Sequence, residues 1–143
     1  MLGSCVLPQE DTPAEALEAI SAELGCFDDW TERYRYIIEI GQSLPPFSEA
    51  WQNEENRILG CQSQVWLKAF QKDGKFFFAG TSDASIVKGL IALLLRVYSG
   101  RTAQEIRAVD PSFLKELGLT GALSANRSNG LASMVKAIER YAS

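Results

Sequence analysis

The feature that most constrains the fold is a pair of strand-like segments joined by Asp73 and Gly74. The segment "QVWLKAFQK" precedes this dipeptide and "KFFFAGTS" follows it, and both are rich in residues that favour β-strands. An Asp-Gly pair between two such segments predicts a tight hairpin turn, because the turn requires positive φ angles. We therefore expect an antiparallel hairpin over residues 64–82, with residues 57–59 as a short third strand.

A long apolar segment, "DASIVKGLIALLLRVYSG", follows the hairpin directly. Ser82 stands where an N-cap residue would begin a helix, and Gly100 stands where such a helix would end. The interior of the segment is apolar on nearly every side of a helix, which is typical of a buried position. We therefore expect a central helix that packs against the hairpin.

Further helices are predicted on both sides of the hairpin. The pattern "TPAE" at Thr12 places a cap, a proline and an acidic residue at the start of a helix that reaches Gly25. The other predicted helices begin near Asp29, Thr102, Asp110 and Ser128, and the last carries an apolar stripe of Leu131, Met134, Val135 and Ile138. The order of helices, hairpin and helices predicts an α+β fold, with a small antiparallel sheet of about three strands packed against helices.

Length and composition favour one domain over residues 1–143, with a flexible segment at residues 1–12. The formal charge is −4, and the cations are scattered, which argues against a nucleic-acid partner. The longest uncharged apolar stretch, residues 89–95, is far shorter than a membrane span. Three widely spaced cysteines predict neither a disulfide framework nor a metal site, and they fit the reducing cytoplasm.

The chain contains no histidine, which excludes Ser-His and Cys-His catalytic arrangements. Cys61 follows Gly60, whose backbone freedom helps to present a neighbouring side chain. A free thiol is only about 3% thiolate at pH 7, although Lys68, Arg127 or a helix N-terminus would raise that fraction. Such a thiol suits the transfer of a group from an activated sulfur, and the alternative is an inert residue that fills space.

Four segments of the chain resemble the SufE/CsdE sulfur-acceptor proteins of iron–sulfur cluster assembly. They are "YRYIIEIGQSLPPF", "GCQSQVWL", "SDASIVKGLIALLL" and "NRSNGLASMVKAI", and the resemblance extends over residues 30–141. It implies a fold similar to that of the iron–sulfur scaffold IscU. It also implies a non-enzymatic partner of a cysteine desulfurase of SufS/CsdA type, whose pyridoxal phosphate belongs to that enzyme, so this chain needs no cofactor of its own.

The resemblance also implies roles for particular residues. Cys61 would accept sulfur as a persulfide, stimulate the desulfurase and pass the sulfur to an iron–sulfur scaffold or another acceptor. Gln62, Ser63 and Arg127 would contact the sulfur or the partner, whereas Asp83 is interpreted as a stabiliser of a helix terminus. The alternatives are an iron–sulfur scaffold of IscU type, which would need several converging cysteine-type ligands, and an interaction module with an inert Cys61.

Overall fold

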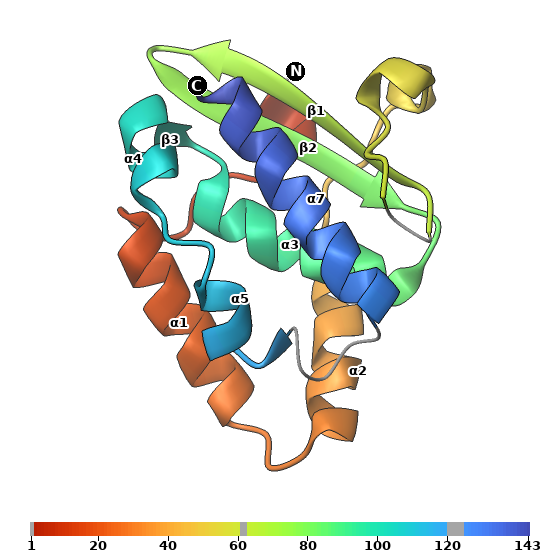
Figure 1. Cartoon of the computed structure of the whole chain (residues 1–143), viewed down its shortest axis with the longest axis vertical. Helices are drawn as coiled ribbons and strands as arrows, with labels where there is room; N and C mark the ends of the chain where they lie inside the picture. Colours follow the sequence, from red (N-terminus) through yellow and green to blue (C-terminus); the bar gives the residue numbers. More distant parts are fainter. Residues whose placement is uncertain (1, 61–62, 120–124) are drawn as a thin grey trace.

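The computed structural model describes residues 2–60, 63–119 and 125–143. Its helices are α1 (Pro13–Gly25), α2 (Trp30–Gly41), α3 (Ser85–Tyr98), α4 (Ala103–Ala108), α5 (Phe113–Glu116) and α7 (Ala125–Tyr141). Its strands are β1 (Val65–Lys72), β2 (Lys75–Ser82) and β3 (Arg101–Thr102), and short 3₁₀ turns cover Leu2–Ser4, Glu49–Trp51 and Glu54–Asn56. The predicted α+β class with a three-stranded antiparallel sheet is confirmed (Figure 1).

The hairpin forms at the predicted turn. Strands β1 and β2 pair along their whole length, from Val65 opposite Ser82 to Lys72 opposite Lys75. Asp73 and Gly74 have φ angles of 52° and 78°, the two positive values that a tight hairpin turn of this kind requires. The prediction of an antiparallel hairpin with its turn at Asp73 and Gly74 is therefore confirmed.

The third strand is not the predicted one. Residues 57–59 contribute only an isolated bridge between Arg57 and Trp66, on the β1 side of the sheet. The third strand is β3, which pairs with Lys75 and Phe76 on the other side, giving the order β1-β2-β3. Because β3 has only two residues, it leaves no periodic signal in the sequence.

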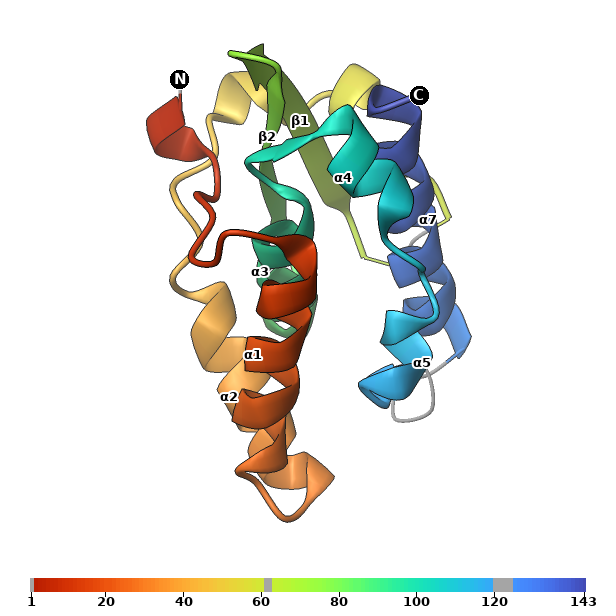
Figure 2. The same ribbon diagram turned by 90° about the vertical axis from the view of Figure 1, so that its left-hand side faces the viewer.

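Helix α3 lies at the centre of the molecule, as predicted. Of its 14 residues, 11 are buried, and it contacts β2 as well as α1, α2 and α7. Figure 2 shows α1 and α2 on one side of the molecule and α4, α5 and α7 on the opposite side. The contact with β2 is close, since a Cβ built on Gly80 would lie 2.8 Å from Cγ2 of Ile91. No helix in the described ranges is long and apolar enough to cross a membrane.

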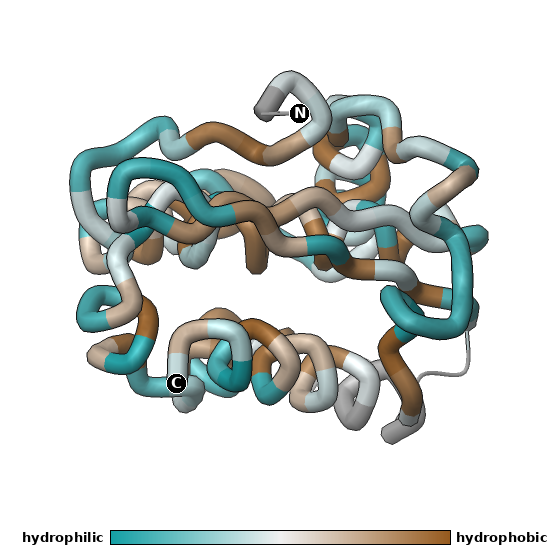
Figure 3. The backbone as a smooth tube through the Cα atoms, turned by 90° about the horizontal axis from the view of Figure 1, so that it is seen from above, coloured by the Kyte–Doolittle hydropathy of each residue, from teal (hydrophilic) through white to brown (hydrophobic). Residues whose placement is uncertain are grey.

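The C-terminal helix α7 packs its apolar stripe against this centre. All four residues of the predicted stripe are buried, and the ring of Tyr141 lies 6.1 Å from that of Phe78 on β2. In the view from above, α7 lies in a layer separate from the sheet, and both hydrophilic and hydrophobic residues occur along it (Figure 3). The opposite face of the sheet carries an aromatic cluster in which Trp51 contacts Phe47 and Phe70.

The first residues make specific contacts, although the sequence suggested a flexible segment over residues 1–12. The Val6 N–H donates to the carbonyl of Phe78 on β2 at 2.9 Å, and the Ser99 hydroxyl donates to the carbonyl of Val6. Cys5 is buried, with only 2% of its surface exposed. We call residues 5–12 the N-terminal strap.

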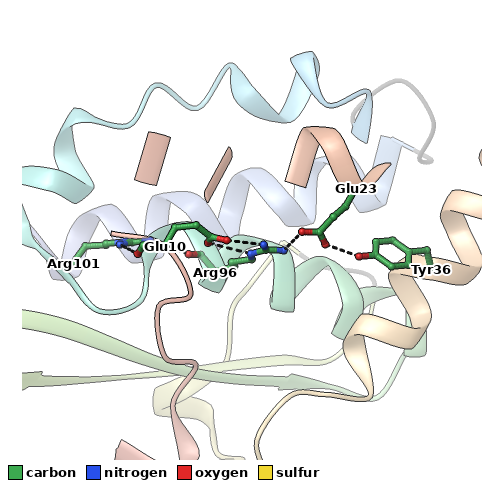
Figure 4. Close-up of polar contacts among 5 residues, drawn as sticks. All are labelled: Glu10, Glu23, Tyr36, Arg96 and Arg101. Atoms are coloured by element: carbon green, nitrogen blue, oxygen red, sulfur yellow. Dashed lines mark hydrogen bonds and ion pairs between the residues drawn. The ribbon is translucent and has the colours of Figure 1, made fainter. Parts of the chain in front are cut away.

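The N-terminal strap is also held by Arg96 of α3 (Figure 4). This guanidinium bonds both carboxylate oxygens of Glu10, at 3.2 Å and 2.7 Å, and it pairs with the carboxylate of Glu23 on α1 at 2.8 Å. Glu23 in turn accepts a hydrogen bond from the hydroxyl of Tyr36 on α2. Burial and this hydrogen bond raise the pKa of Tyr36 to about 12, so its hydroxyl remains a donor at neutral pH. Arg96 therefore links the strap to three helices.

Candidate functional site

The candidate site is built on the segment that connects residue 58 to the start of β1. Cys61 and Gln62, two of the predicted site residues, lie outside the described residues. The residues on either side are described and are held in place. The Ile58 N–H donates to the carbonyl of Val65 at 2.9 Å, which joins the two ends of the segment 59–64. The two residues that flank the cysteine-bearing segment, Ile58 and Val65, are therefore held side by side.

Asp83 holds the same segment from the other side. Its carboxylate accepts a hydrogen bond from the Gln64 N–H at 3.1 Å, and its own N–H donates to the Gln64 carbonyl at 3.3 Å. This reciprocal pair extends the β1–β2 ladder by one residue beyond Val65 and Ser82. The carboxylate therefore bonds the end of the cysteine-bearing segment rather than the first turn of α3.

Ser82 does not cap helix α3, although the sequence predicted that it would. Helix α3 begins at Ser85 after Ala84, which makes no side-chain cap. The Ser82 hydroxyl instead accepts a hydrogen bond from the Ala84 N–H at 3.2 Å, two residues ahead. This local bond competes with helical capping and sets the turn from β2 into α3.

The C-terminal helix approaches the cysteine-bearing segment at Gly60. The φ angle of Gly60 is +88°, and a Cβ built there would lie 2.7 Å from Oγ of Ser133. The positive φ angle favours glycine at this position, and the short distance shows how near Ser133 of α7 lies to the segment. Helix α7 starts at Ala125, three residues before the predicted start, so the backbone of Arg127 lies in its first turn.

The other predicted residues are placed only in part. Ser63 is half-buried at a bend, and the side chain of Arg127 lies outside the described part of the chain. Lys68, considered as an activator of the thiol, places its ammonium 5.9 Å from the ring centroid of Trp51 and 5.6 Å from that of Phe70. Lys68 is thus engaged with the aromatic cluster on the sheet.

The remaining cysteines lie on other elements. Burial raises the pKa of the Cys5 thiol, which lowers its thiolate fraction at neutral pH and makes it a poor nucleophile. Cys26 is exposed at the end of α1, where its thiol donates to the Ala22 carbonyl at 3.3 Å. Within the described ranges, no group of three or more Cys, Asp or Glu side chains is arranged to hold a metal ion.

A hollow of about 590 Å³ opens between the segment that precedes Cys61 and helix α7. We call it the basic hollow and define it by six of its lining residues: Glu55, Arg57, Leu59, Lys136, Arg140 and Tyr141. Sequence analysis did not identify it. Its α7 residues share one helical face at i, i+4 and i+5 spacing, but that spacing alone does not show that the face lies beside residues 55–59.

Comparisons with known proteins agree with this fold. A family model described as "SufE: Fe-S metabolism associated domain" matches residues 18–142. An uncharacterized SufE-like protein of Rhizobium etli is 44% identical over 132 residues, which cover 89% of each chain. A second, from Rhizobium meliloti, is 40% identical over 132 residues, covering 89% of this chain and 94% of the relative.

A solved structure extends the comparison to three dimensions. The solution structure of a hypothetical protein from Thermus thermophilus superposes with a TM-score of 0.71 and covers 91% of this chain and 92% of that one. At 21% identity this likeness shows the fold alone. The family is shown by the sequence match, which spans most of the chain and includes the cysteine-bearing segment. The chain therefore belongs to the SufE family, and its role lies in iron–sulfur metabolism as a sulfur-transfer partner.

Proposed function

We propose that Cys61 accepts sulfur as a persulfide from a pyridoxal-phosphate-dependent cysteine desulfurase of SufS/CsdA type. The protein stimulates that enzyme and passes the sulfur on for iron–sulfur cluster assembly. The observation that carries the proposal is the family match over residues 18–142, which includes a segment with a single nucleophilic side chain, Cys61. The hydrogen bonds of Ile58 and Asp83 support it, because they fix both ends of that segment.

The proposed chemistry is a thiol–persulfide exchange. The Cys61 thiolate attacks the outer sulfur of the enzyme's persulfide, a new S–S bond forms, and the enzyme's own S–S bond breaks. The enzyme's cysteine leaves as a thiolate, which takes up a proton in place of the one that Cys61 loses. One S–S bond replaces another, so the step needs no oxidant or reductant.

The absence of histidine from this chain fits such an exchange. An acyl-transfer enzyme needs its own base, whereas an exchange needs only a thiolate and an activated sulfur. The activated sulfur comes from the partner. The role left to this chain is to present one thiol while its other two cysteines stay out of the reaction, one buried and one on α1.

The test is mass spectrometry of the full-length protein after incubation with a desulfurase and cysteine. We expect a gain of about 32 Da, the mass of one sulfur atom, on the peptide that contains Cys61. The Cys61→Ser variant should gain nothing, whereas Cys26→Ser should behave like the wild type because that thiol lies at the end of α1, outside the cysteine-bearing segment. Labelling of Cys61→Ser, or an unlabelled wild type beside a fully active desulfurase, would refute the assignment.

Asp83 provides a second prediction for the same reaction. We expect Asp83→Ala to slow sulfur acceptance about fivefold, equivalent to about 1 kcal/mol, because the Gln64 N–H loses its acceptor and one end of the segment is released. Asp83→Asn keeps an oxygen acceptor without the acid and should retain most of the rate. The measurement is the single-turnover rate of persulfide formation. Equal losses in the two variants would instead indicate that Asp83 acts as an acid.

A further inference from the structure

We propose that the basic hollow binds an acidic surface segment of the desulfurase that also carries an apolar side chain. This inference rests on the proposed function, since it identifies the surface through which the sulfur donor docks. The hollow lies between residues 55–59 and helix α7. Leu59 precedes Cys61 by two residues in the sequence, so a protein bound in the hollow contacts the segment that carries the thiol.

Charge is the first argument for an acidic occupant. The chain has 14 basic and 18 acidic residues, yet the hollow is lined by three cations, Arg57, Lys136 and Arg140, and one carboxylate, Glu55. The only ion pair that Arg57 makes in the described part of the chain is an exposed contact with Glu54 at 3.5 Å, which is a weak interaction. The cations therefore remain available to an incoming carboxylate.

The two cations on α7 strengthen this argument. Lys136 and Arg140 are exposed and lie at i and i+4, a spacing at which like charges repel and weaken a helix. Neither side chain forms an ion pair with any residue that the structure describes. An acidic partner segment would place negative charge next to both cations, and this attraction would offset the repulsion between them.

Apolar exposure is the second argument. Three large hydrophobic side chains are exposed among the described residues, Leu7, Leu59 and Tyr141, and two of them line the hollow. Leu59 is 74% exposed and Tyr141 is 42% exposed. The ring contact of Tyr141 with Phe78 anchors it to the core, so it offers a preformed surface. Tyrosine and arginine side chains around a small hollow are typical of the centre of a protein interface.

The occupant follows from the position of the hollow. During transfer the donor sulfur must come within bonding distance of Cys61, so the donor protein must cover the surface next to the cysteine-bearing segment. The cations that line the hollow would steer an acidic donor and make association sensitive to salt. We therefore expect charge in the hollow to set the affinity for the desulfurase and to have little effect on the exchange itself.

The test reverses the charges of the hollow in the full-length protein. We expect Lys136→Glu with Arg140→Glu to raise the concentration that half-saturates desulfurase stimulation by at least about tenfold. The single-turnover rate of persulfide formation at saturating protein should stay close to that of the wild type. The matched control is Lys72→Glu with Lys75→Glu, which makes the same charge change at the exposed hairpin turn and should leave half-saturation nearly unchanged.

Two further measurements test separately the effect of salt and the effect of the apolar contact on half-saturation. Added salt should raise half-saturation for the wild type and lower it for the reversed variant, because salt screens attraction to the acidic partner in the first case and repulsion in the second. Leu59→Ser should also raise half-saturation, whereas Leu7→Ser, an equally small change at an exposed leucine on the N-terminal strap, should not. Lys136→Gln with Arg140→Gln gives a milder version of the test if the reversed variant unfolds.

The outcomes separate this proposal from the proposed function. A wild type that never accepts sulfur, even at high concentration, refutes the function itself. A wild type that accepts sulfur, with half-saturation unchanged in both the reversed and the glutamine variants, refutes the hollow while the function stands. Normal acceptance in those variants with impaired delivery to a downstream acceptor would also overturn the proposal, because a different protein would then occupy the hollow.

Discussion

Replacing Gly89 with alanine is expected to cost about 3 kcal/mol or more of the free energy of unfolding. Gly89 lies where α3 crosses α2, and a Cβ there would be 2.0 Å from the Ile37 carbonyl oxygen. On the other helix, a Cβ on Gly41 would be 2.6 Å from the Gly89 nitrogen. The backbones of the two helices are therefore in direct contact, and even one methyl group forces them apart.

The sign of this effect is a direct test of the contact. Alanine is normally the better residue in a helix by about 1 kcal/mol, so without the contact Gly89→Ala would stabilise the protein. Gly25→Ala is the matched control, because a Cβ at Gly25 meets nothing within 4 Å at the end of α1. Denaturant unfolding followed by circular dichroism measures both variants. An unfolding midpoint for Gly89→Ala at or above that of the wild type would contradict the crossing geometry.

The second large effect is expected at Arg96. We expect Arg96→Met to lower the free energy of unfolding by about 2–3 kcal/mol, somewhat less than for a fully buried ion pair. The substitution removes the bonds to Glu10 and Glu23 and leaves two carboxylates close together without a shared cation. Methionine keeps much of the apolar stem, so the loss reports mainly on the charge.

Urea unfolding of the Arg96→Met variant gives the measurement, and Arg57→Met provides the control. The Arg57–Glu54 pair is exposed and 3.5 Å long, so its loss should change stability by no more than about 0.5 kcal/mol. Glu10→Gln, which alters only the strap side of the network, should fall between the two. If Arg96→Met matched the Arg57→Met control, the ion pairs of Arg96 would contribute no more to stability than one exposed pair does, which would contradict the expectation.

Local sequence signals predicted the elements that depend on neighbouring residues. Thr12 caps α1 as expected, and Thr102 forms the expected capping box with Glu105, because each motif is complete within four residues. The Asp73-Gly74 turn set the hairpin register for the same reason. Helix α3 was recognised from its apolar composition, which requires burial whatever the partners are.

Features that depend on distant residues were missed. The N-terminal strap pairs with Phe78 and Arg96, more than 70 residues along the chain, and no pattern in residues 1–12 indicates such partners. The third strand was expected at residues 57–59 instead of residues 101–102, because segments this short carry no periodic signal and only tertiary packing decides which of them pairs with the hairpin. The Ser82 cap was misplaced because a hydroxyl bonds equally well to a turn and to a helix.

The candidate site also combines a feature that the local sequence indicated with features that depend on distant residues. Cys61 was selected from the sequence because it follows a glycine just before the predicted hairpin of a histidine-free chain, and the family resemblance assigned it a reaction. The bond from Asp83 to Gln64 joins residues 19 positions apart, and the basic hollow joins segments more than 70 positions apart. The hollow was not predictable, since it depends on how α7 docks beside residues 55–59. The Asp83 bond continues the hairpin ladder, and it was missed because Asp83 was interpreted as a stabiliser of a helix terminus.

The N-terminal strap also bears on how the protein behaves in solution. On the open side of β2, the Phe78 carbonyl accepts from Val6, the Phe78 N–H donates to the Ser99 hydroxyl, and the Phe76 carbonyl accepts from Gly100. An uncovered strand edge is a template on which a second molecule can pair and begin to aggregate. The strap and residues 99–100 together occupy these backbone groups, so this part of the edge offers a second molecule fewer free donors and acceptors on which to pair.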